Sequence, residues 1–308
     1  MITLGIDTSN YTTSVATFDG ETYEMSKSLL DVREGMRGIR QSEGVFLHNK
    51  ALPDMIIEQL KHAERKIDAV GVSIRPRSIE GSYMPVFTVG EGYAKVVAAS
   101  LGVPLYMYSH QDGHIMAGIY SANAPELIEK PFISLHLSGG TTEILLSRYT
   151  ESGFSCEIVG GTLDISVGQL IDRIGVAMGM KFPCGRELEE LAEEGNKQAD
   201  LPFAINGSYI NLSGIETKLT RNINGYDPDI AKTVLCYIRD ALIKAVNHAI
   251  SQTGAKRVLA VGGVASNRII RKGFSDKLNA TVYLTSPELS TDNAVGTAIL
   301  AYMQSQTK

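Results

Sequence analysis

The chain has 308 residues, of which 44% are hydrophobic and 20% charged, and its formal net charge is −5. This is the composition of a globular protein with a sizeable core, and the length fits one large domain or two lobes of about 150 residues. The negative charge excludes a protein that binds nucleic acid through its overall charge. Basic residues gather in the first quarter, where they form either ordinary solvated surface or a local patch: Arg33, Arg37, Arg40, Lys50, Lys61, Arg65 and Lys66.

Cysteine usage and the absence of long apolar stretches indicate the compartment. Cys156, Cys184 and Cys236 are widely spaced and form no Cys-x-x-Cys pair, which argues against a disulfide framework or a zinc ribbon and fits a reducing cytosol. The N-terminus shows no basic stretch followed by an apolar run, and no stretch reaches the ~18 apolar residues that cross a bilayer. We expect a soluble, cytoplasmic protein that does not associate with membranes.

The predicted elements repeat one pattern in each half of the chain. In the first half we predict strands at 2–6, 14–18, 68–74 and 103–108 and a helix at about 93–100. In the second half we predict strands at 132–137, 143–149 and 258–261 and helices at about 167–180, 186–194, 230–252 and 292–304. Two similar α/β lobes follow from this repetition. We place one at residues 1–125, with a C-terminal helix at about 290–308 packing back on it, and the other at 126–289.

Two histidines four residues apart, His110 and His114, are the strongest sign of chemistry. Residues at i and i+4 share one face of a helix, with Cβ atoms about 5–6 Å apart, so two imidazoles can close on one metal ion. His136, on the more polar face of its strand, is either a further ligand or a structural histidine. Asp292 stands where a helix is predicted to begin, so it (or Ser290) caps the helix or supplies an oxygen ligand.

Three turns each follow a predicted strand, at residues 7–13, 138–142 and 262–267. Glycine turns let backbone N–H groups approach a phosphate closely, so we interpret the three as a nucleotide site. None matches the P-loop or the Rossmann fingerprint. Three such turns in this order indicate a different nucleotide-binding fold.

The combined order of motifs resembles the TsaD family, the tRNA threonylcarbamoyladenosine transferases formerly called O-sialoglycoprotein endopeptidases or glycoproteases. The motifs that carry the resemblance are His-x-x-x-His at 110–114, Ser-Gly-Gly-x-Thr at 138–142, the segments 161–164, 172, 182–185 and 211–218, Gly-Gly-Val-Ala-Ser-Asn at 262–267, and Thr-Asp-Asn at 291–293. The resemblance implies a two-lobed α/β fold of the actin/hexokinase/Hsp70-type ATPases.

The family's site residues can be carried over position by position. The resemblance implies one iron or zinc ion at His110, His114 and Asp292, with His136 in the place of a tyrosine ligand of archaeal relatives. It implies ATP, AMP or a carbamoyl-adenylate bound by six residues: Ser138, Gly139, Gly140, Asp172, Gly185 and Asn267. The implied reaction moves a threonylcarbamoyl group from the adenylate to the tRNA adenosine next to the anticodon. A TsaB-like protein or a second copy of the chain is the implied protein partner, and no DNA is expected.

The chain departs from the family on the acceptor side. Tyr11 and Thr12 replace two acids of the family's first turn, and Thr141 replaces a histidine. A glycine-proline-glycine stretch of the family is replaced by Arg75-Pro76-Arg77-Ser78. These changes leave the catalytic residues unassigned and point to a divergent paralogue.

Three other functions compete with this one. An O-carbamoyltransferase would use the same adenylate with another acceptor. A non-catalytic partner of the TsaB type would lack the metal histidines, which this chain retains. A metallopeptidase of the His-Glu-x-x-His type needs a glutamate where Gln111 stands, so we expect no proteolysis.

Overall fold

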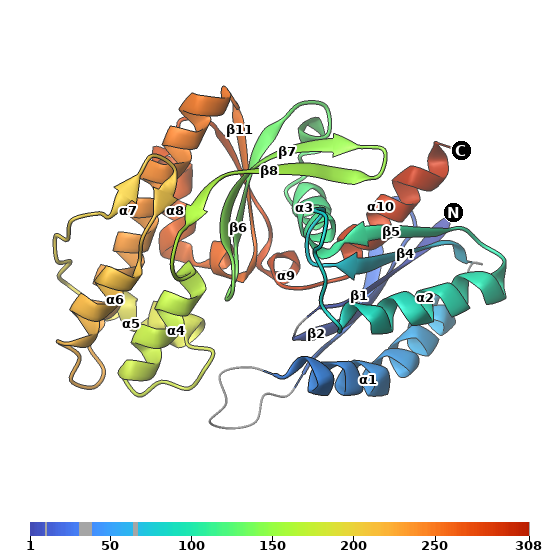
Figure 1. The fold of residues 1–308 in the computed structure, drawn as a ribbon, viewed down its shortest axis with the longest axis horizontal. Coiled ribbons are helices and arrows are strands. Elements are labelled where there is room, and N and C mark those ends of the chain that lie inside the picture. The colour runs from blue at the N-terminus through green and yellow to red at the C-terminus, as the bar shows by residue number, and fades with distance from the viewer. Residues whose placement is uncertain (10, 31–38, 64–66, 308) are drawn as a thin grey trace. The chain divides into compact units, whose positions relative to one another are not determined.

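Two β-sheets organise the chain, which we describe from a computed structural model over residues 1–9, 11–30, 39–63 and 67–307. Contacts divide the chain into two units (Figure 1). The first unit contains Met1–Pro125, Tyr149–Ser155 and Thr291–Lys308, and the second contains Glu126–Arg148 and Cys156–Ser290. Arg33, Arg37, Arg65 and Lys66 of the basic first quarter lie outside the described residues.

The sheet of the first unit has the strand order β3-β2-β1-β4-β5. Its strands are β1 (Ile2–Thr8), β2 (Thr12–Phe18), β3 (Tyr23–Leu29), β4 (Ile67–Arg75) and β5 (Leu105–Ser109). The first three are antiparallel neighbours, whereas β4 pairs in parallel with both β1 and β5. The four predicted strands are confirmed with shifted ends, and β3 was not predicted. Because β1, β4 and β5 are parallel, their carboxyl ends meet at one edge of the sheet.

Helices cover both faces of this sheet: α1 (Gln41–His62), α2 (Phe87–Leu101), α3 (His110–Ser121) and α10 (Val295–Gln306). Side chains of α1 and α2 form one apolar core with β1 and β4. The opposite face meets α10, where a Cβ on Gly5 would stand 2.7 Å from the Ala298 nitrogen and one on Gly71 would stand 2.6 Å from the Thr297 carbonyl oxygen. Glycines at these two positions therefore let α10 lie directly on the strands.

Two helices of the first unit begin several residues away from the predicted positions, and the helix predicted at 167–180 in the second unit ends at Ala177. The predicted helix at 93–100 begins earlier, at Phe87. The predicted helix at 292–304 begins later, at Val295, because Ala294 is its N-cap and the Asn293 side chain accepts the Val295 N–H at 3.0 Å. Neither Ser290 nor Asp292 caps this helix, so the capping interpretation was wrong for both.

The sheet of the second unit has the strand order β12-β11-β6-β7-β8-β10-β9. Its strands are β6 (Phe132–Leu137), β7 (Thr142–Thr150), β8 (Gly153–Thr162), β9 (Ile205–Asn206), β10 (Tyr209–Ile210), β11 (Arg257–Val261) and β12 (Thr281–Leu284). In the middle of this sheet, β6 pairs in parallel with β11 and antiparallel with β7. The predicted strands at 132–137, 143–149 and 258–261 are confirmed.

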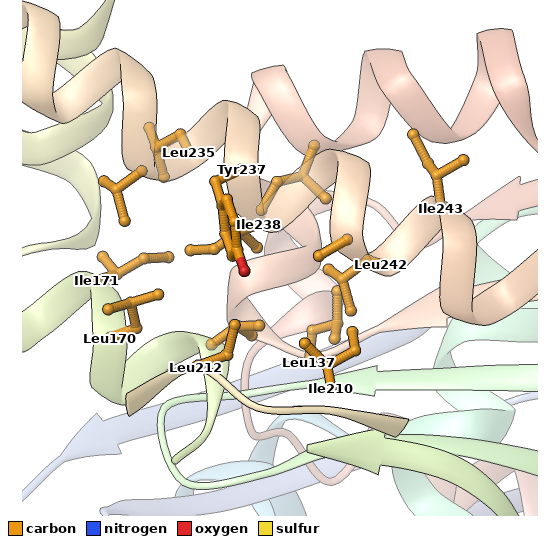
Figure 2. Close-up of a cluster of buried hydrophobic side chains, with 14 of the residues drawn as sticks. Leu137, Leu170, Ile171, Ile210, Leu212, Leu235, Tyr237, Ile238, Leu242 and Ile243 are labelled. Carbon is orange, nitrogen blue, oxygen red and sulfur yellow. The ribbon is translucent and has the colours of Figure 1, made fainter. Parts of the chain in front are cut away.

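The core of the second unit lies between this sheet and its helices. These are η1 (Pro125–Leu127), α4 (Val167–Ala177), α5 (Gly185–Glu194), α6 (Ser213–Thr220), α7 (Pro228–Thr253), η2 (Gly263–Ser266), α8 (Arg268–Lys277) and α9 (Pro287–Ser290). Figure 2 shows side chains of α7 meeting Leu170 and Ile171 of α4 and Leu137 of β6. None of the described helices is long and apolar enough to cross a membrane.

Candidate metal centre and nucleotide turns

The histidine pair stands at the start of α3 because Ser109 and Asp112 close a capping box there. The Asp112 N–H donates to Ser109 Oγ at 3.1 Å, and the Ser109 N–H donates to Asp112 Oδ2 at 2.8 Å. The box fixes the first helical residue as His110, and His114 follows one turn later on the same face. Asp112 also accepts the Phe154 N–H at 3.0 Å, so both of its carboxylate oxygens are used in hydrogen bonds that hold the start of α3.

Asp292 joins the two histidines to complete a group of three donors. His110 Nε2 and His114 Nε2 are 3.0 Å apart, and Asp292 Oδ1 lies 3.4 Å from the first and 3.2 Å from the second. Ser9 Oγ donates to the other carboxylate oxygen of Asp292 at 3.0 Å, which orients it. Among the described residues, these three form a group of His, Cys, Asp or Glu side chains able to hold a metal ion.

The donor set fits a transition metal in spacing and in chemistry. Zinc binds histidine nitrogen and carboxylate oxygen at about 2.0–2.2 Å, which places neighbouring tetrahedral ligands about 3.3–3.5 Å apart. The three observed separations of 3.0, 3.2 and 3.4 Å come close to that triangle. Two histidines and one carboxylate are also the ligands of a common iron(II) site, and three protein ligands leave a position for substrate.

Asp7 is a residue of this site that our sequence analysis did not single out. It lies near the end of β1, is 1% exposed, and its Oδ1 is 2.9 Å from His110 Nδ1. A carboxylate there holds the imidazole with Nε2 directed at the metal position, and it makes that nitrogen a stronger ligand. The signal in the sequence is an acid at the end of a buried strand, which by itself fits many structural roles.

The charges of His110, His114 and Asp292 shift one another's pKa values. Burial lowers the pKa of His110, but Asp7 and Asp292 outweigh this effect and raise its pKa to about 10. Burial and the neighbouring His110 charge lower the pKa of His114. Burial raises the pKa of Asp292, but hydrogen bonds from the two histidines hold it well below its usual value. Near neutral pH and without metal, these shifts favour a charged His110 between two carboxylates and a neutral His114 beside it.

The first turn carries the replaced residues and one buried histidine. Thr12 is buried at the start of β2, whereas Tyr11 is partly buried. Thr13 Oγ1 is 2.8 Å from Nδ1 of His48, a fully buried residue of α1 that sequence reasoning missed. Residues 7–13 contain no glycine, so the argument that glycine lets the backbone of a turn approach a phosphate was wrong for this first turn.

In the second unit, the turn at 138–140 rests on the start of α4. The Thr141 N–H donates to Ser138 Oγ at 3.1 Å, and Ser166 Oγ donates to the Gly139 carbonyl at 2.7 Å. A Cβ on Gly139 or Gly140 would meet nothing within 4 Å, so their backbone is open to a ligand. This accessibility suits phosphate binding, which stays a prediction.

The other predicted nucleotide residues lie at helix ends or on helices of the same unit. On α4, Asp172 accepts the Cys184 N–H at 2.8 Å; burial raises the pKa of Asp172, and this hydrogen bond opposes the shift. Gly185 begins α5 with open space around it. Asn267 caps α8 by accepting the Ile270 N–H at 3.1 Å, a structural role our sequence analysis did not foresee.

His136 lies on β6, opposite Glu143 of β7 and beside Val261 of β11. It belongs to the second unit, whereas the three-donor group belongs to the first. Its role as a fourth metal ligand therefore stays a prediction.

Comparison with known proteins identifies the family. The sequence model of "TsaD: tRNA N6-adenosine threonylcarbamoyltransferase" matches residues 33–299. The chain belongs to this family. A relative from Sulfurihydrogenibium sp. (strain YO3AOP1) with that enzyme name is 29% identical over 100% of this chain and 92% of its own length. A second, from Porphyromonas gingivalis, is 29% identical over 98% of this chain and 93% of its own length.

Solved structures at low identity share the fold. The T. kodakarensis HypF structure matches 99% of this chain at a TM-score of 0.61 and 15% identity, and the matched part is 47% of the HypF chain. A ROK family glucokinase from Streptomyces griseus matches 98% of this chain and 100% of its own, at a TM-score of 0.55 and 14% identity. The predicted α/β fold of the actin/hexokinase/Hsp70-type ATPases is confirmed.

Proposed function

We propose that this protein transfers a threonylcarbamoyl group from a carbamoyl-adenylate to the tRNA adenosine next to the anticodon, using an iron or zinc ion at His110, His114 and Asp292. The observation that carries the proposal is the triangle of donors within 3.4 Å in a member of the TsaD family. Its relatives are named for this transfer. We place the activity in the cytoplasm, with a TsaB-like protein or a second copy as partner.

In this reaction the adenosine N6 forms a bond to the carbamoyl carbon, the bond from that carbon to the phosphate oxygen breaks, and AMP leaves. The bound ion would supply a Lewis acid for the carbamoyl carbonyl. Asp7 orients His110, and Ser9 orients Asp292, through the hydrogen bonds described above. N6 also loses one proton, which passes to a phosphate oxygen of the leaving AMP or to water. The family's two acids are replaced here by the hydroxyl groups of Tyr11 and Thr12.

In the second unit, backbone amides of the 138–140 turn would bind the phosphate of the leaving AMP, because oriented N–H groups stabilise negative charge. The Asp172 carboxylate would accept hydrogen bonds from ribose hydroxyl groups. The backbone of Gly139 and Gly140 is open to a ligand. Asp172 accepts the N–H of Cys184, which directly precedes α5.

The test combines metal analysis with an acceptor assay. Purified protein is analysed for bound metals and then incubated with labelled threonylcarbamoyl-adenylate and unmodified tRNA, and the modified nucleoside is measured by mass spectrometry. We expect about one iron or zinc per chain and label in tRNA. His114→Ala should lose both, whereas His62→Ala, an exposed histidine of the same unit, should lose neither.

Two outcomes contradict the proposal in different ways. Metal-replete protein that labels a small molecule or a protein but never tRNA would indicate an O-carbamoyltransferase. Protein that binds no metal at any tested concentration would indicate a non-catalytic, TsaB-like partner.

A further inference from the structure

The carboxyl end of β4 places an arginine next to the strand that leads into the histidine helix. Arg75 pairs in register with Ser109 of β5, and Ser109 directly precedes His110. The Gln111 N–H donates to the Pro76 carbonyl at 3.1 Å, which ties the segment after Arg75 to the first turn of α3. Arg75 therefore occupies the same sheet edge as the three donors.

Arg75 has no anionic partner among the described residues. Its side chain is partly buried, and its Nε is shielded from solvent without a hydrogen-bond acceptor. By contrast, Arg239 of the second unit pairs with Asp240 at 2.7 Å. A shielded guanidinium N–H without an acceptor costs free energy, so an arginine kept in this state calls for an explanation.

The local structure does not depend on the guanidinium. The segment is held by other groups: Ser78 Oγ donates to Asp112 Oδ2 at 2.8 Å, and the Arg77 N–H donates to Ser82 Oγ at 3.0 Å. Together with the Pro76 carbonyl, these bonds fix the segment through backbone and hydroxyl groups. The Arg75 charge is thus available to a ligand.

We infer that Arg75 binds an oxyanion of the donor molecule beside the metal centre, an inference that rests on the proposed function. A guanidinium presents N–H donors in a planar fork that matches two oxygens of a carboxylate or a phosphate. The donor carries both groups, a threonyl carboxylate and the adenylate phosphate, on either side of the carbamoyl carbon. Arg75 lies at the sheet edge of the three metal ligands, which would hold the carbamoyl end, so we expect its side chain to reach either the carboxylate or the phosphate.

The test measures binding by calorimetry with metal-loaded protein and three ligands. These are AMP, a non-hydrolysable analogue of threonylcarbamoyl-adenylate, and the same analogue with its carboxylate replaced by a carboxamide. Arg75→Gln should bind the carboxylate analogue about 10- to 100-fold more weakly than the unaltered protein, as expected for a lost charge-assisted contact. Arg75→Lys should recover part of the loss, and Arg40→Gln, an exposed arginine of the same unit, should change nothing.

The pattern of losses identifies the oxyanion. A loss confined to the carboxylate analogue assigns Arg75 to the carboxylate, and an equal loss for all three ligands assigns it to the phosphate. Both support the inference if metal content and melting temperature are unchanged. Binding of all three ligands within twofold of the unaltered protein overturns it and leaves the proposed function standing. If the unaltered protein binds none of them, the proposed function fails as well.

Discussion

Asp7→Asn is the substitution that most directly tests the metal centre. Asparagine has nearly the same shape as aspartate and can still accept a hydrogen bond from His110 Nδ1, so the change removes a charge and little else. Asp7 is 1% exposed and lies 2.9 Å from the imidazole. Water cannot replace the lost charge at such a site.

The expected loss of metal affinity follows from this contact. Removing the carboxylate behind a metal-binding histidine costs about 10- to 100-fold in affinity, or about 1.4–2.7 kcal/mol. Near neutral pH a second effect opposes the loss, because Asp7 also raises the pKa of His110 and so favours a proton that competes with the metal. We therefore expect a loss near the lower bound at pH 7 and near the upper bound at pH 9.

The assay is a competition titration with a chromophoric chelator at both pH values. Asp54→Asn, an exposed acid of α1, is the matched control and should leave the affinity unchanged. Equal affinities of Asp7→Asn and the unaltered protein at both pH values would refute the argument that Asp7 supports a metal ligand. So would an equal loss in the control.

Two further predictions concern pH and packing. Because the pKa of His110 is raised from 6.5 to about 10, its ion pairs stabilise the metal-free protein fully below pH 6.5, and this contribution is lost as pH rises toward 10. Metal affinity should instead rise about tenfold per pH unit from pH 6.5 to 8, measured by the same titration, since binding expels that proton; a flat profile would contradict this. Gly296→Ala would place a Cβ 2.7 Å from the Ala117 nitrogen and closer still to the Gly113 carbonyl, so α3 and α10 must separate. For Gly296→Ala, urea unfolding should show that the free energy of unfolding falls by about 3 kcal/mol or more, together with weaker metal binding. The control Gly214→Ala, whose Cβ meets open space, should change the free energy of unfolding by less than about 1 kcal/mol. Similar losses in the two variants would argue against the packing explanation.

Strands with continuous apolar runs could be predicted from the sequence, and half-exposed elements could not. β1, β6 and β11 are buried along nearly their whole length, so their composition alone marks them. In contrast, β3 is a partly exposed edge strand with charged residues, which weakens the strand signal. The helix α1 contains Pro53 in its interior, a residue that normally argues against a helix there.

The candidate site was predictable only where its residues carry a local signal. His110 and His114 are one helical turn apart, so spacing sufficed. Asp292 was identified through the family motif, because spacing could not choose between a cap and a ligand. Asp7 is 103 residues from its partner His110, and only the register of the sheet brings the two together. A contact between residues so far apart in the sequence cannot be predicted from the spacing of neighbouring residues.

Backbone packing, more than side-chain packing, positions the metal ligands relative to one another. Gly113 and Gly296 bring α3 and α10 into backbone contact, and Gly5 brings β1 onto α10. The ligand Asp292 precedes α10, and the two histidines lie on α3, so these contacts hold the three donors at fixed separations. Tyr11 and Thr12 of the first turn are not among the residues that form these backbone contacts. We therefore expect substitutions at these two positions to leave the three metal ligands in place, whereas substitutions at Ser78, which donates to Asp112 at the start of α3, should disturb them.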